Sequence, residues 1–474
     1  MKIVILGAGR VGESLAENLA TRDNDVTVVD TDRARLAALQ ERLDLRGLHG
    51  SGILPSVLRD AGAEDADLLI AVIALDESNL VACKLAHQLF NVPTRIARVR
   101  SPQFQDAPEI TGSGGFEAQR VICPEQTVVE MIERLIETPE ALQVVDFGRG
   151  RLSLVVVRTV AGGPLVDHNI GTIKQHMPDV DIRIVAVVRN EESIPVTGET
   201  IIQPGDEVFC LAEAGDIRAV LSELSKIDRP VRRVIIAGGG NIGLRLALGL
   251  TRDYNVKIIE ADKRRCESLA EQLKASVLVL NGDATDEGLL AEENVRSTDM
   301  FLALTSDDED NIMSCLLAKR MGARRTLAII NRKSYAQLVQ GGAIDIAISP
   351  SQVTIGELLR HVRRGDIVNV HSLRRGAAEA LEIIAHGERG SSRVVGRRID
   401  EIDLPQGATI GALVRGLTPA DEASADSVDP KSAKVLMAHH DTVIEAGDHV
   451  IVFADDPRTI PRVERLFQVS ASFF

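Results

Sequence analysis

The chain has 474 residues, enough for about three or four domains of ordinary size, and 45% of them are hydrophobic and 26% charged. This composition is typical of globular proteins and excludes wholesale disorder. The formal net charge is −15, and an acidic protein repels nucleic-acid backbones and anionic lipid. Aromatic residues make up only 3% of the chain, so base-stacking platforms are also lacking and we expect no nucleic-acid partner.

We expect the chain to carry no signal for export or for membrane insertion. The apolar run at the amino terminus, Ile3–Leu6, is too short for a signal peptide, and no stretch of about 18 apolar residues occurs. The five cysteines are far apart and show no metal-binding spacing, which indicates free buried thiols in a reducing compartment. We therefore expect a soluble, cytoplasmic protein that reaches a membrane only through a partner.

The sequence contains one unit that occurs twice in succession. The offset between similar segments stays nearly constant along the chain, which indicates a duplication. The matching pairs are Lys2–Gly12 with Arg233–Gly243, Val28–Asp30 with Ile258–Glu260, Asp67–Val72 with Asp299–Leu304, Asp76–Asn79 with Asp308–Asn311, and Pro204–Val208 with Ala446–Val450.

The first part of each unit alternates short apolar strands with amphipathic helices, which is typical of a doubly wound parallel sheet. In the first copy we predict strands at Ile3–Leu6, Val26–Asp30, Leu68–Ala74 and Arg95–Val99, and helices at Glu13–Ala20 and Asn79–Phe90. A linking helix follows in each copy, at Pro124–Glu137 and Pro350–Arg364.

The remainder of each unit is predicted to be a small β-rich module. In the first copy it has strands at Ser153–Val157, Ile182–Val188 and Glu207–Leu211 and a closing helix at Ala214–Leu224. The second copy carries a polar, Ser- and Ala-rich insertion at 418–434, which we interpret as a flexible surface loop.

The predicted fold is therefore α/β. It has two doubly wound, Rossmann-like parallel-sheet domains, each followed by a small α+β domain. The predicted bounds are 1–123 and 232–349 for the parallel-sheet domains, and 140–226 and 366–469 for the small domains.

A glycine-rich turn follows the first predicted strand. It has the pattern GxGxxG and is formed by Gly7, Ala8, Gly9, Arg10, Val11 and Gly12. Asp30 closes the next strand about 20 residues on, where a dinucleotide-binding fingerprint has its acidic residue. The glycines allow a tight turn and a close approach of backbone N–H groups to a pyrophosphate at the helix N-terminus. Asp30 would accept hydrogen bonds from ribose hydroxyls and repel a 2′-phosphate, which favours NAD(H) or an adenine nucleotide over NADP.

The second copy repeats this fingerprint. Its turn is formed by Gly238, Gly239, Gly240, Asn241, Ile242 and Gly243, and Glu260 takes the place of the acidic residue. Because two complete fingerprints occur on one duplicated frame, an accidental match is improbable.

Residues after the later strands are further candidate contacts, since ligands of such sheets bind at the carboxyl ends of strands. In the first copy they are Ser51, Ile73, Ala74 and Arg98. In the second copy they are Asp283, Thr305, Ser306 and Arg332. We predict that Arg98 and Arg332 each end the following strand of their copy within reach of a phosphate, with a solvated arginine as the alternative. The second copy keeps hydroxyls and a carboxylate that the first copy lacks, so we expect two similar sites of unequal affinity.

No catalytic constellation accompanies these motifs. A dehydrogenase needs an acid or base beside the nicotinamide, and the histidines of the two β-rich regions share no spacing. No metal cluster, GxSxG motif or Walker motif is found. We therefore expect nucleotide binding without turnover. An NAD-dependent oxidoreductase is the alternative, and a transcription regulator is disfavoured by the negative charge.

The duplicated plan resembles the RCK (also called KTN) regulatory domains of potassium channels and transporters over essentially the whole chain. The resemblance rests on Ile3–Gly9, Arg95–Pro102, Ala318–Ala323, Val370–Gly376 and Val463–Phe467. It departs at Ile73 and Ala74, where Thr-Ser is common, and at the 418–434 insertion.

The resemblance implies a cytoplasmic regulatory subunit, peripheral to the inner membrane, that gates a membrane potassium channel subunit. It implies NAD(H) as the ligand, with ATP or ADP at the same or equivalent sites. It further implies a homo-oligomeric ring of RCK domains, which we expect to be a tetramer.

Overall fold

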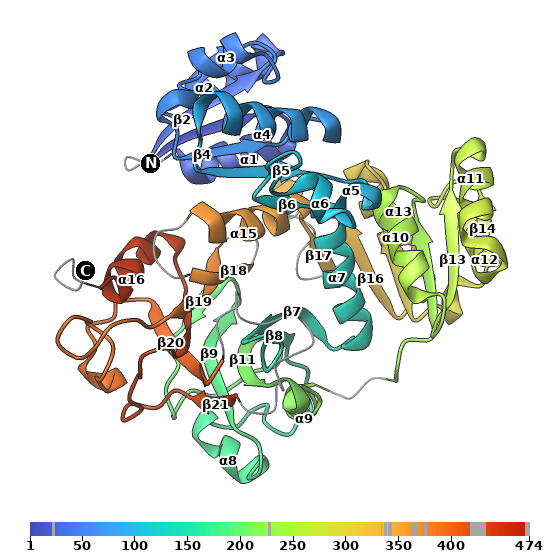
Figure 1. Ribbon diagram of the computed structural model, residues 1–474. Coiled ribbons are helices and arrows are strands. Elements are labelled where there is room, and N and C mark those ends of the chain that lie inside the picture. The colour runs from blue at the N-terminus through green and yellow to red at the C-terminus, as the bar shows by residue number, and fades with distance from the viewer. Residues whose placement is uncertain are drawn as a thin grey trace. The chain divides into compact units, whose positions relative to one another are not determined.

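Figure 1 shows the computed structural model, which describes residues 1–20, 24–225, 229–332, 334–335, 339, 344–362, 367–373, 377–417 and 433–469. The chain divides into two compact units. The first consists of Met1–Val128 and Pro350–Val362, and the second of Val129–Ser349 and Arg363–Phe474. The first unit holds one parallel sheet, and the second unit holds the other three sheets.

The first parallel sheet has the strand order β3-β2-β1-β4-β5-β6, which is that of a dinucleotide-binding fold. Its strands are β1 (Lys2–Leu6), β2 (Asp25–Asp30), β3 (Arg46–His49), β4 (Leu68–Ala71), β5 (Thr94–Arg98) and β6 (Arg120–Ile122). The helices that connect or follow these strands are α1 (Arg10–Leu19), α2 (Arg33–Gln40), α3 (Pro55–Asp60), α4 (Asp76–Phe90), α5 (Pro102–Gln105), α6 (Pro108–Thr111) and α7 (Pro124–Glu137).

The core of this sheet follows from its continuous apolar strands, which are buried on both faces. Val4 and Leu6 of β1 lie in one hydrophobic cluster with residues of α3 and α4, such as Leu58 and Leu80. Helix α1 packs on β1 and β2, and it also contacts α15 (Pro350–Val362), the linking helix of the second copy. The linking helix of the second copy therefore belongs to the compact unit of the first copy.

The second parallel sheet repeats the same topology with the order β14-β13-β12-β15-β16-β17. Its strands are β12 (Arg233–Ala237), β13 (Asn255–Glu260), β14 (Leu278–Asn281), β15 (Met300–Ala303), β16 (Arg325–Ile329) and β17 (Ile346–Ile348). Its helices are α10 (Asn241–Leu250), α11 (Lys263–Leu273), α12 (Glu287–Glu292) and α13 (Asp308–Arg320).

The other two sheets are antiparallel and five-stranded, with the orders β10-β9-β11-β8-β7 and β18-β19-β22-β20-β21. The first has β7 (Ala141–Phe147), β8 (Leu152–Arg158), β9 (Ile182–Arg189), β10 (Glu192–Ile194) and β11 (Glu207–Glu213), with helices α8 (Ile173–His176) and α9 (Ile217–Leu224). The second has β18 (Ile367–Leu373), β19 (Ala378–Ile384), β20 (Ala408–Arg415), β21 (Lys434–Met437) and β22 (His449–Ala454), with helix α16 (Ile460–Phe467).

The two antiparallel modules share one hydrophobic core. One buried cluster combines residues of both sheets, and the rings of Phe209 and Phe453 lie 5.7 Å apart within it. Polar contacts also cross between the modules, because the Gly148 N–H donates to Glu382 at 3.2 Å. Each module thereby buries an apolar face that it could not bury alone.

The predicted fold class is confirmed, and all five cysteines are buried, with no disulfide bond among the described residues. The strand predicted at Leu68–Ala74 ends earlier, at Ala71, because the backbone of Ile73 bonds the side chain of Asn79 instead of a neighbouring strand. Most of the 418–434 segment lies outside the described residues. Its last residue, Lys434, begins β21 and pairs with Arg415, so it is not part of a loop. No described helix is long and apolar enough to cross a membrane.

Candidate nucleotide sites

The first glycine turn is built as the motif predicts. Gly7 has φ +109°, a conformation that side chains disfavour, and its N–H donates to the carbonyl of Val29 at 2.8 Å. A Cβ on Gly12 would lie 1.8 Å from the Gly7 oxygen, so only glycine fits where α1 packs on the turn. A Cβ on Gly9 would meet only the Nη1 of Arg35, at 3.8 Å. The space above Gly9 is therefore open, as a pyrophosphate requires.

The second turn has the same geometry. Gly238 has φ +104°, and a Cβ on Gly243 would lie 2.1 Å from the Gly238 oxygen. A Cβ on Gly240 would meet no described heavy atom within 4 Å. The arrangement of one strained, one crowded and one open glycine is thus repeated. Both turns fit a bound pyrophosphate on this criterion.

The predicted acidic residues face their glycine turns. Asp30 accepts hydrogen bonds from the N–H of Ala8 at 2.5 Å and from the N–H of Asp32 at 2.8 Å. Glu260 accepts from the N–H of Gly239 at 2.8 Å and, through its other oxygen, from the backbone after β13. Each carboxylate is held at the end of its second strand, beside the turn, where a ribose would lie.

A buried asparagine in each copy was missed by sequence reasoning. Asn79 and Asn311 are both fully buried. The Asn79 amide bonds the backbone N–H and carbonyl of Ile73 and donates to the Arg98 carbonyl at 2.9 Å. Asn311 makes the same bonds to Thr305 and donates to the Ile329 carbonyl at 2.9 Å. These asparagines join the carboxyl ends of neighbouring strands, and the repeated Asp76–Asn79 segment was the available signal.

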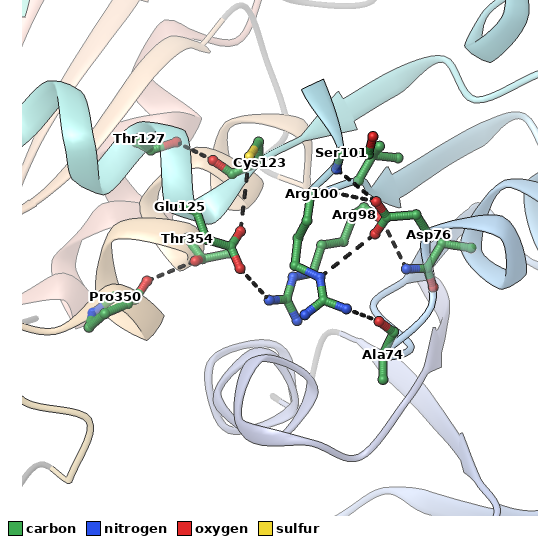
Figure 2. A network of polar contacts seen from close by, with 12 residues as sticks. Ala74, Asp76, Arg98, Arg100, Ser101, Cys123, Glu125, Thr127, Pro350 and Thr354 are labelled. Carbon is green, nitrogen blue, oxygen red and sulfur yellow. Dashed lines mark hydrogen bonds and ion pairs between the residues drawn. The ribbon is translucent and has the colours of Figure 1, made fainter. Parts of the chain in front are cut away.

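Arg98 lies where it was predicted, at the end of β5, but its side chain is engaged by the protein. Its Nη2 donates to Oε1 of Glu125, at the start of α7, at 2.9 Å. Figure 2 shows this pair beside a second one, in which Arg100 points toward Asp76 and donates to the carbonyl of Ala74. Two arginines therefore lie together at this edge of the sheet.

Arg332 does not end its strand as Arg98 does, which corrects the prediction from the sequence. Asn79 donates a hydrogen bond to the carbonyl of Arg98, and the equivalent Asn311 donates one to the carbonyl of Ile329, the last residue of β16. Arg98 therefore corresponds to Ile329. Arg332 lies three residues further on and forms an exposed ion pair with Glu309 at 2.8 Å. Residue types repeat at slightly different spacing in the two copies, and backbone register alone reveals the true correspondence.

The remaining predicted residues lie just after the strand ends, as expected. The side chains of two of them, Thr305 and Asp283, form hydrogen bonds within their own loops. The Thr305 hydroxyl donates to Asn311 at 2.8 Å and to the carbonyl of Asp307 at 3.1 Å. Oδ1 of Asp283 accepts from the N–H and hydroxyl of Thr285, and these bonds lower the pKa of Asp283. Ser51, Ile73, Ala74 and Ser306 lie in the loops after β3, β4 and β15. Their contact with a nucleotide stays a prediction.

No group of three or more histidine, cysteine or acidic side chains that could hold a metal ion occurs in the described part of the chain. What the arrangement offers is two anion-accepting turns, each with an acidic residue beside it. Such a site can bind a dinucleotide or an adenine nucleotide through its pyrophosphate and ribose.

Comparison with known proteins agrees with this arrangement. Residues 3–124 and 234–350 match the TrkA-N domain, and residues 154–225 match the TrkA-C domain. The chain is 54% identical over 474 residues to the Trk system potassium uptake protein TrkA of Halomonas elongata. It is 50% and 47% identical to the proteins of the same name from Vibrio alginolyticus and Haemophilus influenzae. Each of these matches covers 100% of both chains.

Two solved structures share the fold. The crystal structure of the GsuK RCK domain matches with a TM-score of 0.61 at 19% identity and covers 98% of this chain and 94% of that chain. The structure of the GsuK channel bound to NAD matches with a TM-score of 0.59 at 18% identity and covers 98% of this chain and 78% of that chain.

Proposed function

Because the chain belongs to the family of Trk system potassium uptake proteins TrkA, we propose that its two glycine turns bind nucleotides and that binding gates a membrane potassium channel. The single observation that carries this proposal is the duplicated turn, with an open central glycine and an acidic residue beside it. The ligand class is NAD(H), with ATP or ADP as alternatives at the same sites. A solved structure of similar fold is that of the GsuK channel bound to NAD.

The residues proposed to hold the nucleotide divide by role. The backbone around Gly9 and Gly240 receives the pyrophosphate, because these positions are open. Asp30 and Glu260 accept hydrogen bonds from the ribose hydroxyls. The positions after β4 and β15, from Ile73 and Thr305 onward, together with Arg98, meet the far half of the ligand. In this proposal the protein acts by binding the nucleotide and not by converting it.

The gating partner is a membrane potassium channel subunit of the TrkH/TrkG-like kind. The chain associates with it from the cytoplasmic side, as a ring of RCK domains built from several copies, for which a tetramer is the expected assembly. A nucleotide that has better contacts in one conformation of the ring shifts the population toward that conformation, and this difference in affinity supplies the work of gating.

Potassium flux through vesicles that hold the membrane subunit tests this function. Flux is measured with the full-length protein added and with NAD, NADH, ATP or ADP varied. We expect flux to depend on the nucleotide, and we expect Gly9→Val and Gly240→Val to fold and associate but to respond less. If both variants lose nucleotide and still control flux as the parent does, nucleotide control is refuted. Steady conversion of NAD(H) by the purified protein would instead support the oxidoreductase alternative.

A further inference from the structure

The two proposed sites differ in charge at equivalent positions. The asparagine bonds equate Arg98 with Ile329. The carboxylates that begin α4 and α13 extend this register, because Asp76 accepts from the N–H groups of Arg100 and Ser101, and Asp308 from those of Asn331 and Arg332. The equivalence therefore rests on matched hydrogen bonds in both copies.

The first site gathers three arginines where the second has neutral side chains. Arg10 is exposed at the first residue of α1, beside the open glycine. Arg98 ends β5, and Arg100 lies two residues beyond it (Figure 2). Their counterparts in the second copy are Asn241, Ile329 and Asn331.

The guanidinium of Arg98 has unused hydrogen-bonding capacity. Its side chain is only 18% exposed, and its Nε is buried and donates to no acceptor among the described residues. A buried donor without an acceptor is unfavourable, and an oxygen of an anionic ligand at this position would satisfy it. Glu125 engages only the Nη2 group. The geometry of Arg98 is therefore that of a group poised for a further anion.

The second site gathers carboxylates where the first has none. Asp283 follows β14, Asp307 caps the N-terminus of α13, and Asp310 lies in the first turn of that helix. Burial raises the pKa of Asp310, and the negative charges of Asp307, Asp283 and Glu309 raise it further. Their counterparts in the first copy are Ser51, Leu75 and Ser78.

These differences add up to a large change in charge. Six of them, at the positions of the three arginines and the three carboxylates, each make the second site more negative by one unit. Two changes act in the opposite direction, since Ser101 is replaced by Arg332 and Glu125 by Ser351. Summed over these eight aligned positions, the second copy is therefore four units more negative than the first.

We propose that the two sites are specialised by ligand charge, with the first preferring a nucleoside triphosphate and the second preferring NAD in its oxidised form. This proposal rests on the proposed function and names the ligand of each site. Beyond the pyrophosphate, a bound ligand extends toward the ends of β4 and β5 in the first copy and of β15 and β16 in the second. The part of the ligand that lies there is either a third phosphate or the nicotinamide half of a dinucleotide. Arg98 and Arg100 favour a third phosphate there. Asp307 and Asp310 repel a phosphate and favour the cationic nicotinamide ring.

Calorimetry on full-length single-site variants tests this specialisation. Gly240→Val leaves only the first site and Gly9→Val leaves only the second, and each is titrated with ATP and with NAD in the absence of divalent cations. We expect the ratio of ATP affinity to NAD affinity to be at least about tenfold higher at the first site, which is the scale of one charge-assisted hydrogen bond. The ATP affinity of the first site should also fall as salt is raised.

Exchanging residues between the copies provides the matched control. Arg98→Ile with Glu125→Ser places the residues of the second copy in the first, and Asn331→Arg places the counterpart of Arg100 in the second copy. The first exchange keeps the net charge of the pair at zero, and the second changes a residue that is only partly buried, so each should fold. We expect the first exchange to lower ATP binding at the first site, and the second exchange to raise it at the second site.

The outcomes separate this proposal from the proposed function. Equal ATP-to-NAD ratios at the two sites, with both nucleotides bound, would overturn the specialisation and leave the proposed function intact. Exchanges that fold and leave both ratios unchanged would overturn the roles of Arg98 and Arg100. A parent protein that binds neither nucleotide would overturn both proposals.

Discussion

The two parallel-sheet domains keep the residues that fix their backbone and differ in the residues that face the ligand. Gly12 and Gly243 admit no side chain, and the buried Asn79 and Asn311 make identical hydrogen bonds. The eight aligned positions compared above have changed by four charge units in total. After duplication, backbone geometry tolerated little change because the fold depends on it, whereas the charge of each site could diverge.

The two antiparallel modules show the same division. Both keep a bidentate ion pair, in which Arg189 bonds Asp206 and Arg415 bonds Asp448, with both distances 2.8 Å in each pair. The second module alone has a histidine beside the shared core, since the ring of His371 lies 5.0 Å from that of Phe147, and its counterpart in the first module is Val145. The comparison between copies therefore extends from the sites to the core.

The largest expected effect separates structural from ligand-facing glycines. Gly12→Ala and Gly243→Ala should each destabilise their domain by at least about 4 kcal/mol, because the new Cβ overlaps a backbone oxygen. Gly9→Ala and Gly240→Ala should change the free energy of unfolding by less than about 1 kcal/mol, since their surroundings are open. Urea unfolding followed by circular dichroism measures the difference. Equal destabilisation at all four positions would break the comparison.

The second effect concerns the pKa of His371, which is lowered to about 4. Burial is the main cause, the positive charge of Arg134 lowers the pKa further, and the negative charge of Glu382 opposes the shift. The unfolded chain takes up a proton on this histidine near pH 6.5, and the folded chain does so only near pH 4. Stability is therefore lost as the pH falls through this window, by up to about 3 kcal/mol.

The variant His371→Val isolates this contribution, because it installs the residue that the first module already carries. The difference in the free energy of unfolding between the variant and the parent should shift in favour of the variant as the pH falls from 7 to 4. Unfolding in urea at several pH values measures it. A constant difference across this range would show that His371 titrates normally in the folded protein.

The third effect concerns the arginine–aspartate ion pair that is present in both antiparallel modules. Asp206 and Asp448 are fully buried, so Asp206→Asn or Asp448→Asn removes one charge and leaves the partner arginine poorly compensated. Each substitution should cost about 2–3 kcal/mol of stability, the scale of hydrogen bonds between charged groups. Because the modules share one core, thermal unfolding should show the same loss from either variant. A loss confined to one of them would show that the copies have diverged here too.

How far the sequence predicts this molecule depends on the range of the interactions. Strand and turn positions followed from local apolar runs and glycine spacing, and the structure has them close to where they were predicted. The roles of Asn79 and Asn311 depend on carbonyls of a neighbouring strand, which local patterns do not place. Arg332 was paired with Arg98 by residue type, and only the strand register showed that Ile329 is the counterpart.

The fourth effect concerns ligand choice and returns to the sites. Asp30→Asn should reduce NAD binding at the first site by about 1–3 kcal/mol, the range for a hydrogen bond to a charged group, and Glu260→Gln should do the same at the second. Both substitutions should also narrow the preference for NAD over NADP, because the repulsion of a 2′-phosphate is removed. Calorimetry with both cofactors measures this. Equal affinity of the parent for NAD and NADP would count against these roles.

The smallest expected effect tests whether Arg332 and Arg98 have the same structural role in their two copies. Arg332 and Glu309 are 55% and 49% exposed, and ion pairs in water contribute little to stability because water screens them. Arg332→Ala should therefore leave the melting temperature nearly unchanged. Arg98 is 18% exposed and compensates Glu125, which is 14% exposed, so Arg98→Ala should lower the melting temperature measurably by leaving that carboxylate unpaired. Thermal unfolding of the two variants side by side tests this, with Arg59→Ala as an exposed control in the first copy. If Arg332→Ala destabilises the protein as much as Arg98→Ala does, the two arginines are structural equivalents after all, and the register-based assignment of Arg98 to Ile329 does not describe their roles.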